Sequence, residues 1–274
     1  MPKNPTTYVA RPLAGFPLEA ELAAMREILP AAVATAQLTE AEGGGPVHFV
    51  TLLPGMARGY KRADGVPVVA TQPSHPSDDV ARDLGNALVA ALAADPKSAA
   101  TPAPLGEPGP RLQELIDQDA PVSFELRDSF EYWTELDPED KTLADTAVRL
   151  AEETTPTAAV GEVAGAYWAR INGREYLRWS LGIAEDELLD ALARLQAKRQ
   201  AGVVEDSKYA GAFRTMGVVI PVWELPRGAS AEELAGPLAE FKARLDQALA
   251  EERPLDANER RSRAGLVARF LTLR

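Results

Sequence analysis

The chain has 274 residues, of which 46% are hydrophobic and 26% charged, the composition of a globular protein with one large domain or two of ordinary size. It contains no cysteine, which excludes disulfides and zinc sites built on thiolates, and its two histidines are too few for a histidine-rich metal site. A formal net charge of −12 argues against a broad nucleic-acid-binding surface.

The sequence predicts neither a signal peptide nor a membrane span. Residues 1–17 lack the basic stretch and apolar core of a signal peptide, and nowhere do 18 apolar residues follow one another. We therefore expect a cytoplasmic protein without a membrane span.

The first hundred residues are expected to form an α-β-β-α unit. Apolar spacing of three and four predicts a helix over 18–38, kinked at Pro30. Strands are expected at 47–53 and 65–71, and a second amphipathic helix at 77–94.

A change of composition follows this unit. Residues 96–110 contain five prolines and two glycines, which is typical of a linker or a long surface loop. The predicted organisation is an N-terminal α+β unit over 1–95, this Pro-rich segment, and a C-terminal α+β unit over 111–274.

The second unit opens with an expected short helix at 112–116, a strand at 122–133 and a helix at 141–153. Asn172-Gly173, between apolar and aromatic runs, is the strongest short signal for a β-hairpin. A helix at 185–199 follows, and Ser230-x-x-Glu233 and Asp256-x-x-Glu259 indicate two further helix starts.

One pattern occurs twice. The stretch from Gly59 to Val66 leads through apolar residues to a helix start at Ser77, and the stretch from Gly211 to Val218 leads to one at Ser230. Strand pairs followed by a helix are thus expected at 47–95, 166–199 and 209–250. Antiparallel strand pairs, each followed by a helix, predict an α+β fold and are compatible with an internal duplication of an α-β-β-α unit.

Candidate catalytic groups are few. His48 lies in an expected strand and could act as a general base, but the sequence places no nucleophile or carboxylate beside it; His75 lies in a Pro-rich turn. Carboxylates at helix starts, such as Asp78-Asp79, are explained by capping and the helix dipole. No phosphate loop, dinucleotide fingerprint or nucleophile elbow is found. We assign no catalytic residue, metal or cofactor, and an enzymatic role is left open.

Aromatic residues and arginines alternate in the expected hairpin. Alternation about Asn172-Gly173 is expected to bring Trp168 and Tyr176 near each other across the strands. Such groups serve as binding hot spots or base-stacking platforms, whereas tryptophans in the core would give the same pattern, and we favour core positions for the tryptophans. The candidate partner-binding residues here are Trp168, Arg170, Tyr176 and Arg178.

The C-terminal end is locally basic. From Glu259 to Arg274, five arginines accompany one carboxylate. These arginines either pair with the acidic body of the protein or form a dock for an anion or a partner. Arg260, Arg261 and Arg263 complete the candidate partner-binding set.

A series of short motifs resembles a known family. In order they are Arg11-Pro12-Leu13-Ala14-Gly15-Phe16-Pro17, Leu52-Leu53-Pro54, Gly109-Pro110-Arg111-Leu112-Gln113-Glu114-Leu115, Ala166-Tyr167-Trp168, Leu177-Arg178-Trp179, the stretch 188–195, Pro221-Val222-Trp223-Glu224-Leu225-Pro226 and Glu259-Arg260-Arg261. The chain is similar, over nearly its whole length, to an uncharacterised protein family of high-GC Gram-positive bacteria. Longer members begin with a SEC-C-type zinc motif, which is absent here. The resemblance implies an adaptor-like role and supplies no catalytic residues.

Three functions are compatible with the sequence. The first is a non-enzymatic cytoplasmic adaptor that binds an unidentified protein partner. The second is a small-molecule-binding protein or enzyme with a pocket between the two predicted halves, using His48 or clustered carboxylates. The third is ribosome or nucleic-acid association through the C-terminal arginines, against which the net charge argues. The sequence does not specify the oligomeric state.

Overall fold

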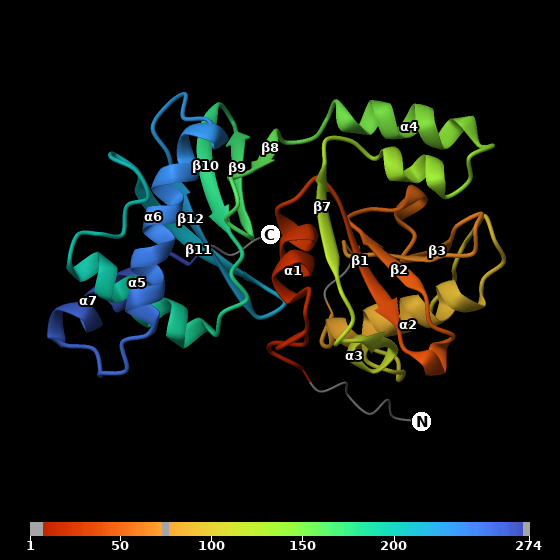
Figure 1. Cartoon of the computed structure of the whole chain (residues 1–274), viewed down its shortest axis with the longest axis horizontal. Coiled ribbons are helices and arrows are strands. Elements are labelled where there is room, and N and C mark those ends of the chain that lie inside the picture. Colours follow the sequence, from red (N-terminus) through yellow and green to blue (C-terminus); the bar gives the residue numbers. More distant parts are fainter. Residues whose placement is uncertain (1–7, 73–76, 271–274) are drawn as a thin grey trace. The chain divides into compact units, whose positions relative to one another are not determined.

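The computed structural model describes residues 8–72 and 77–270. In these residues the chain is a mixed α+β protein, as the sequence predicts. It divides into two compact units, the first ending at Thr154 and the second beginning at Thr155 (Figure 1). Each unit has its own sheet. No helix among the described residues combines the length and apolar character needed to cross a membrane.

The first unit contains four α-helices, three short 3₁₀ helices and seven strands within its described residues. The helices are α1 (Glu19–Glu27), α2 (Val80–Ala93), α3 (Leu112–Leu115) and α4 (Lys141–Ala151), with η1 (Glu40–Glu42), η2 (Pro54–Met56) and η3 (Glu131–Glu135). The strands are β1 (Ala31–Leu38), β2 (Pro46–Val50), β3 (Gly59–Lys61), β4 (Pro67–Ala70), β5 (Ser98–Ala99), β6 (Ile116–Asp117) and β7 (Ser123–Arg127).

The first sheet is mixed. Its order is β5-β3-β4-β2-β1-β6, and β7 also pairs with β1, beside which it runs in Figure 1. All pairs are antiparallel except β2 with β4. Along β1, Ala32, Ala34 and Ala36 are fully buried whereas Val33 and Thr35 are half-buried. One face of the sheet is therefore buried, and the other face is covered only in part.

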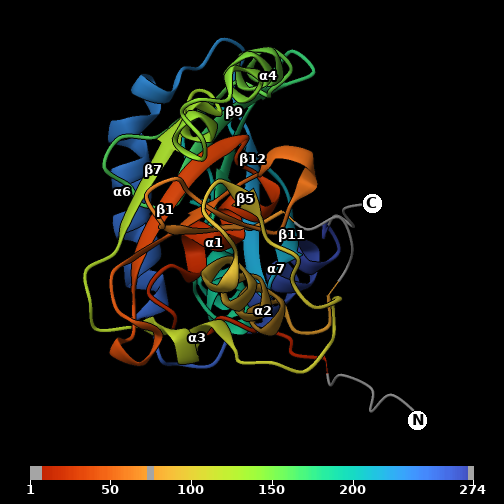
Figure 2. The ribbon, with the colours of Figure 1, turned by 90° about the vertical axis from the view of Figure 1, so that its right-hand side faces the viewer.

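Different elements cover different parts of this unit. α2 packs on β3 and β4, and α3 and α4 lie at opposite ends of the unit (Figure 1, Figure 2). A separate apolar cluster joins the partly covered face to η3 and α4; its members include Val50, Val68, Tyr132, Trp133, Leu136 and Ala147.

Residues 18–38 are not the single kinked helix that the spacing predicts. α1 ends at Glu27, and β1 begins at Ala31, directly after Pro30. Proline lacks the N–H that a helix interior needs, so it separates the two elements here. Alanine favours helices, but pairing of β1 with β2 and with β7 overrides that preference.

The Pro-rich segment 96–110 lies inside the first unit, on α2. The side-chain N–H groups of Asn86 donate to the carbonyl of Glu107 at 3.1 Å, and the Asp83 carboxylate accepts from the Gly106 N–H at 3.0 Å. Arg82 donates to the Gly109 carbonyl. The division of the chain at 154/155 thus differs from the predicted boundary at 96–110.

The second unit has three α-helices and five strands in the part that the structure describes. The helices are α5 (Glu185–Ala197), α6 (Ala231–Leu249) and α7 (Ala257–Val267), and the strands are β8 (Thr157–Ala159), β9 (Ala166–Ile171), β10 (Arg174–Trp179), β11 (Lys208–Thr215) and β12 (Val218–Glu224). The sheet is antiparallel, in the order β11-β12-β10-β9-β8.

Local signals in this unit are confirmed. β9 and β10 form the hairpin about Asn172-Gly173, and both residues have the positive φ of that turn. Capping boxes open α6 at Ser230 and α7 at Asp256. Pro237 lies within α6, which continues through it.

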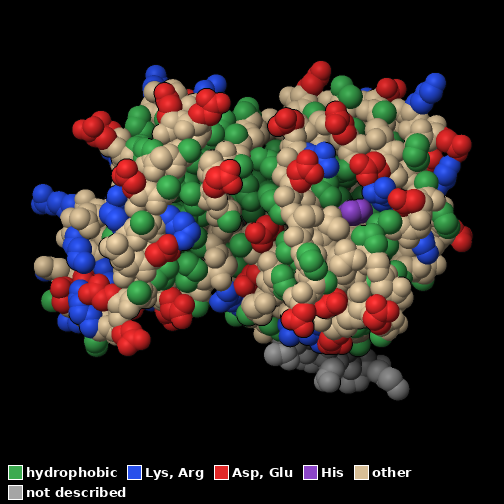
Figure 3. All heavy atoms as spheres, in the orientation of Figure 1, with side chains coloured by type: hydrophobic (Ala, Val, Ile, Leu, Met, Phe, Trp, Pro, Cys, Tyr) green, Lys and Arg blue, Asp and Glu red, His purple; other side chains and the backbone are tan. Residues whose placement is uncertain are grey.

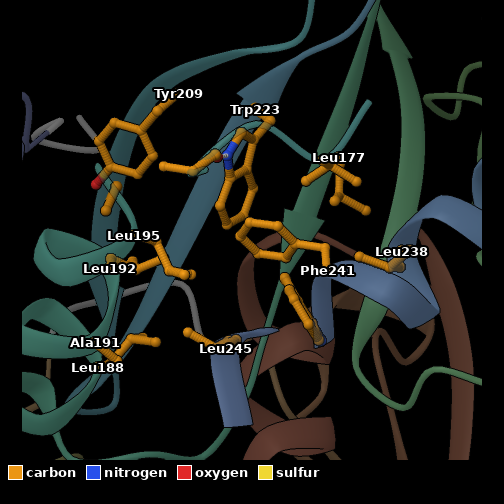
Figure 4. Close-up of a cluster of buried hydrophobic side chains, with 14 of the residues drawn as sticks. Leu177, Leu188, Ala191, Leu192, Leu195, Tyr209, Trp223, Leu238, Phe241 and Leu245 are labelled. Atoms are coloured by element: carbon orange, nitrogen blue, oxygen red, sulfur yellow. Dashed lines mark hydrogen bonds between the residues drawn. The ribbon is translucent and has the colours of Figure 1, made fainter. Parts of the chain in front are cut away.

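An aromatic core joins the helices of the second unit to its sheet (Figure 4). The rings of Trp223 and Phe241 meet edge-on with centroids 5.5 Å apart, and Tyr209 lies 5.9 Å from Trp223. The Trp223 indole donates to the Ala201 carbonyl at 2.8 Å, so burial leaves no unpaired donor on it. Of the two hairpin tryptophans for which we favoured core positions, Trp179 is fully buried, as is Trp223, but Trp168 is only half-buried.

The two copies of the sequence pattern share local structure but do not confirm a duplication. Each forms an antiparallel strand pair followed by a helix, β3-β4-α2 and β11-β12-α6. Their wider pairing differs, because β4 lies parallel to β2 whereas β12 lies antiparallel to β10.

Candidate functional site

A pocket of about 120 Å³ lies on the partly covered face of the first sheet. β1, β2, β4 and β7 supply its floor, and residues in and after η3 supply a wall. The side chains that line the pocket come from residues before and after the Pro-rich segment in the sequence, and His48 is one of them. In Figure 3 a histidine, drawn in purple, reaches the surface with basic and acidic side chains close by.

The strand register places three polar residues side by side on this floor. Thr35 lies opposite His48 in the β1–β2 pair and opposite Ser123 in the β1–β7 pair. Side chains at directly opposed positions have Cβ atoms about 5 Å apart. Ser123, Thr35 and His48 therefore form a polar row across β7, β1 and β2.

His48 is held by its neighbour in this row. Its Nδ1 lies 2.9 Å from the Thr35 hydroxyl, and Nε2 has no hydrogen bond among the described residues. Burial, and secondly the positive charge of Arg62, lower the pKa of His48 below 6.5, while Glu135 and Asp64 oppose this shift. The ring is therefore neutral at pH 7 and can both accept and donate one hydrogen bond.

Arg62 crosses one side of the pocket. Its two terminal nitrogens bind Glu135 at 2.5 Å and Asp64 at 2.9 Å. Its Nε is buried and has no hydrogen-bond partner in the described structure. Arg111, Arg178, Arg194 and Arg244, none of which lines this pocket, also have a buried Nε without a hydrogen-bond partner among the described residues, so this feature is not specific to the pocket.

Arg127, on β7, repeats this arrangement on another side. One terminal nitrogen lies 2.8 Å from the Glu125 carboxylate. Its Nε is likewise buried and without a partner among described residues. The pocket thus contains two guanidinium groups, each paired with a carboxylate through a terminal nitrogen.

The remaining lining is apolar and rigid. Val33, Val50 and Val68 supply aliphatic surface from three adjacent strands. Tyr132 closes one side; its hydroxyl donates to the Leu52 carbonyl at 2.9 Å and lies 3.1 Å from the Thr51 hydroxyl. Burial raises the pKa of Tyr132 to about 12, so the phenol stays protonated. The site combines an apolar floor with a few fixed polar groups, as small-molecule sites do.

Of the seven residues proposed from the sequence, Arg170 and Trp168 are in contact, whereas no hydrogen bond, ion pair or ring contact among the described residues joins the hairpin candidates to Arg260, Arg261 or Arg263. Trp168 pairs with Leu177 and Tyr176 with Ala169, so Trp168 and Tyr176 lie on opposite faces of the hairpin and are not the neighbours that we expected. The two-residue turn fixes this register.

The hairpin residues have their own partners. Trp168 is half-buried, and its indole donates to the Ala229 carbonyl at 2.8 Å. The Arg170 guanidinium lies 5.5 Å from the Trp168 ring centroid and 3.2 Å from Glu175. Arg178 is buried and bonds the Thr157 hydroxyl at 3.2 Å, and burial lowers its pKa to about 10.

The C-terminal arginines have two kinds of surroundings. Arg263 binds Asp190 at 2.7 Å and also Asp186, both on α5, as the pairing with the acidic body predicts. Arg260 and Arg261 are exposed, and their hydrogen bonds to Leu255 and Asn258 involve neutral oxygens. No carboxylate within the described part of the chain forms an ion pair with either.

Of the pocket residues, sequence reasoning singled out only His48. Arg62 and Asp64 fall within the repeated pattern, but nothing in that pattern assigned them a role. The usable signal was the alternation of polar residues with apolar ones in strands, at Thr35, His48 and Ser123. His75 lies outside the described residues. No cluster of three or more potential metal ligands occurs in the described ranges.

The fold and the pocket define an α+β protein of two compact units with a polar and apolar cavity in the first. The chain belongs to a family of unknown function, DUF5926, whose model matches residues 12–274. No curated protein and no solved structure matches it.

Proposed function

We propose that the protein binds a small molecule in the pocket that contains His48. The observation that carries this proposal is the cavity itself, where His48, whose Nε2 has no hydrogen bond among the described residues, lies with three valines and two ion-paired arginines. Small-molecule sites typically combine such an apolar lining with a few fixed polar groups.

The position of the pocket supports the same proposal. Its polar groups come from strands and from side chains fixed by ion pairs, so they need little ordering when a ligand arrives. A cavity of about 150 Å³ accommodates benzene, so one of about 120 Å³ accommodates a molecule of similar or smaller size.

The test fills the pocket from its edge strand. Ser123 is exposed and lines the pocket, so Ser123→Phe places a ring in the cavity. Gln118→Phe, at an exposed turn of the same unit outside the pocket, is the matched control. Small molecules extracted from each purified protein are identified by mass spectrometry.

We expect a compound to accompany the wild type and Gln118→Phe but not Ser123→Phe. Equal recovery from all three proteins would contradict the pocket as its site. The proposal as a whole would be contradicted if the purified protein carried no compound and if no member of a small-fragment library shifted the NMR resonances of the His48 ring.

A second candidate is the cytoplasmic adaptor role, which rests on a different surface. Arg260 and Arg261 present two exposed positive charges on an acidic protein, with no ion pair to a described carboxylate. The resemblance to a family whose longer members carry a SEC-C-type zinc motif also supports docking to a protein partner. The partner would offer a complementary acidic surface.

The structure sharpens the test of this candidate. Deletion of α7 is not a suitable test, because α7 packs on α5 and buries Leu266, so its loss would damage the fold. Arg260→Ser/Arg261→Ser leaves these contacts intact. Arg149→Ser/Arg227→Ser, at exposed positions elsewhere, changes the net charge equally. Loss of an affinity-purified partner with the first double variant but not the second supports the adaptor role, and retention with both contradicts it.

A further inference from the structure

Resting on the proposed function, we infer that the pocket is reactive: Nε2 of His48 acts as a nucleophile that cleaves small uncharged acyl esters. This reaction adds chemistry to binding and uses a side chain that already lines the cavity. Three features of the site support it: a free nitrogen on His48, a hydroxyl that holds the ring, and space beside it.

The hydrogen bond to Thr35 selects the reactive form of the ring. A neutral imidazole carries its proton on one nitrogen only. With the proton on Nδ1, the ring donates to the Thr35 hydroxyl, 2.9 Å away, and Nε2 keeps its lone pair. The other tautomer would leave an Nε2–H without an acceptor among the described residues, and unpaired N–H groups are rare in proteins. Nε2 is therefore the nitrogen with a free lone pair.

The surroundings of His48 keep that lone pair available. Burial and the positive charge of Arg62 lower the pKa of the ring below 6.5, against the opposing charges of Glu135 and Asp64. Only the unprotonated ring can attack an electrophile, and it is the main form at pH 7. The other charged groups of the lining, Arg127 and Glu125, are paired with each other.

These charges favour an acyl group over a phosphoryl group as the electrophile. A histidine nitrogen can attack either kind of centre. Both arginines of the lining already have a carboxylate partner, so they offer a phosphate ester no unpaired positive charge. The formal charge of −12 on the chain also repels such an anion. An uncharged ester meets neither obstacle.

The cavity has room for a short acyl chain. Its volume is about 120 Å³, and a cavity of about 150 Å³ holds benzene, which is larger than an acetyl or butyryl group. Valine side chains from three adjacent strands provide an apolar surface for the chain. The histidine drawn in purple in Figure 3 reaches the surface, so the alcohol of the ester can leave directly to solvent.

Two steps complete the reaction. In the first, Nε2 attacks the acyl carbon, a C–N bond forms, and the ester C–O bond breaks as the alcoholate leaves with the electron pair. The acylated ring is positive; Thr35 accepts from its Nδ1–H, and the negative charges that favour an imidazolium stabilise it. In the second, water attacks the acyl carbon, the C–N bond breaks and the carboxylic acid leaves. The proton that water loses balances the one that the alcoholate takes up, and nothing is oxidised or reduced.

The experiment follows the release of nitrophenolate from para-nitrophenyl acetate and from para-nitrophenyl phosphate at pH 7, with the uncatalysed rate subtracted. The variants are His48→Asn, which removes the nucleophile, Ser123→Phe, which fills the pocket, and Thr35→Val and Thr35→Ser, which remove and keep the hydroxyl. His75→Asn removes the other histidine and Gln118→Phe adds a ring outside the pocket, so they are the matched controls. Mass spectrometry of acid-quenched protein locates the acyl group, and thermal unfolding confirms that each variant is folded.

We expect the wild type and both controls to cleave the acetate at equal rates and to leave the phosphate intact. His48→Asn and Ser123→Phe should lower the rate at least about tenfold, with the acyl group on His48 in the wild type. Thr35→Val should slow the reaction and Thr35→Ser should not, because Thr35 is a positioning residue. The rate should rise with pH about a midpoint below 6.5 that equals the pKa of His48 measured by NMR.

Other results overturn the inference. An unchanged rate in His48→Asn, or an acyl group found on another residue alone, would show that His48 is not the nucleophile. Faster cleavage of the phosphate than of the acetate would show that the substrate class is wrong.

A probe that binds without reacting separates this inference from the proposed function. The amide para-nitroacetanilide has the same acyl group and a poor leaving group, and its binding is followed by NMR of His48 in the His75→Asn protein. If the ester is not cleaved but the amide shifts the His48 resonances, and Ser123→Phe abolishes that shift, the pocket binds small molecules and the reaction is wrong. If neither cleavage nor a shift is seen, both proposals are overturned for this pocket.

Discussion

Single residues decide the chemistry of the pocket through the partners they have and lack. His48 has the Thr35 hydroxyl on one nitrogen and a positive neighbour in Arg62. Arg62 has carboxylates at both terminal nitrogens and none at Nε. These contacts place ion-paired side chains beside a neutral ring, and each contact can be tested by one substitution.

The pKa of His48 should lie below 6.5 and should rise in Arg62→Met. Removal of Arg62 takes away a lowering charge and leaves Glu135 and Asp64, which favour the imidazolium. Titration of the ring resonances by NMR measures both values, with Arg174→Met as control. A wild-type pKa at or above 6.5 would show that the ring is not held neutral by this surrounding.

The same shift makes stability depend on pH. With a lowered folded-state pKa, the folded protein binds fewer protons at His48 than the unfolded chain between that pKa and 6.5, so the His48 contribution to stability falls as pH decreases through this window. His48→Asn should flatten this part of the profile. Urea unfolding at several pH values measures it, and parallel profiles for the two proteins would contradict the prediction.

Tyr132→Phe should destabilise the first unit by about 1–3 kcal/mol, because the buried Thr51 hydroxyl and the Leu52 N–H lose their partner. The Leu52 carbonyl keeps the Trp133 indole as a donor at 3.0 Å, which favours the lower end of this range. Urea unfolding followed by tryptophan fluorescence gives the free energy. Tyr8→Phe, at a residue 68% exposed, is the control and should have no effect.

At the scale of elements, Gly85 allows α2 to pack closely against the Pro-rich segment 96–110. A Cβ at Gly85 would lie 2.2 Å from the Pro110 carbonyl oxygen, a contact that the rigid backbone cannot absorb without moving. This close approach lets the polar side chains of α2 bind residues 106–109. The Pro-rich segment is thereby part of the first unit.

Gly85→Ala should therefore destabilise the protein although it improves helix propensity. Overpacking costs about 1–3 kcal/mol, and the gain in a helix is about 0.5–1 kcal/mol. Gly265→Ala, in α7 with no atom near the added methyl group, should be stabilising by about 0.5–1 kcal/mol. Thermal unfolding of both variants measures the contrast, and stabilisation by Gly85→Ala would contradict the close packing.

At the scale of the whole molecule, the charge distribution disfavours nucleic acid as a partner. The net charge is −12. Within the C-terminal basic cluster, Arg263 is already paired with carboxylates of α5. We expect no saturable binding of a fluorescent single-stranded oligonucleotide at about 10 µM protein and about 50 mM salt. Binding that appears and then weakens steeply with added salt would contradict this, and its loss in Arg260→Ser/Arg261→Ser would locate it.

Much of the fold could be predicted from the sequence, because its signals are local. The Asn172-Gly173 hairpin, the capping boxes at Ser230 and Asp256, and the amphipathic α2 each depend on residues a few positions apart. Turn geometry, capping and helix periodicity act over such distances. These signals determined the α+β class and most helices.

Tertiary structure decided what local signals leave open. Residues 31–38 became a strand because β2 and β7 pair with them from both sides, which no local preference of their alanines indicates. The pocket likewise unites Thr35, His48 and Ser123 through strand register, and Arg62 binds Glu135, 73 residues away in the sequence. Contacts between residues far apart in the chain depend on the pairing of whole strands, so a sequence without its fold determines the elements, and only the fold determines the site.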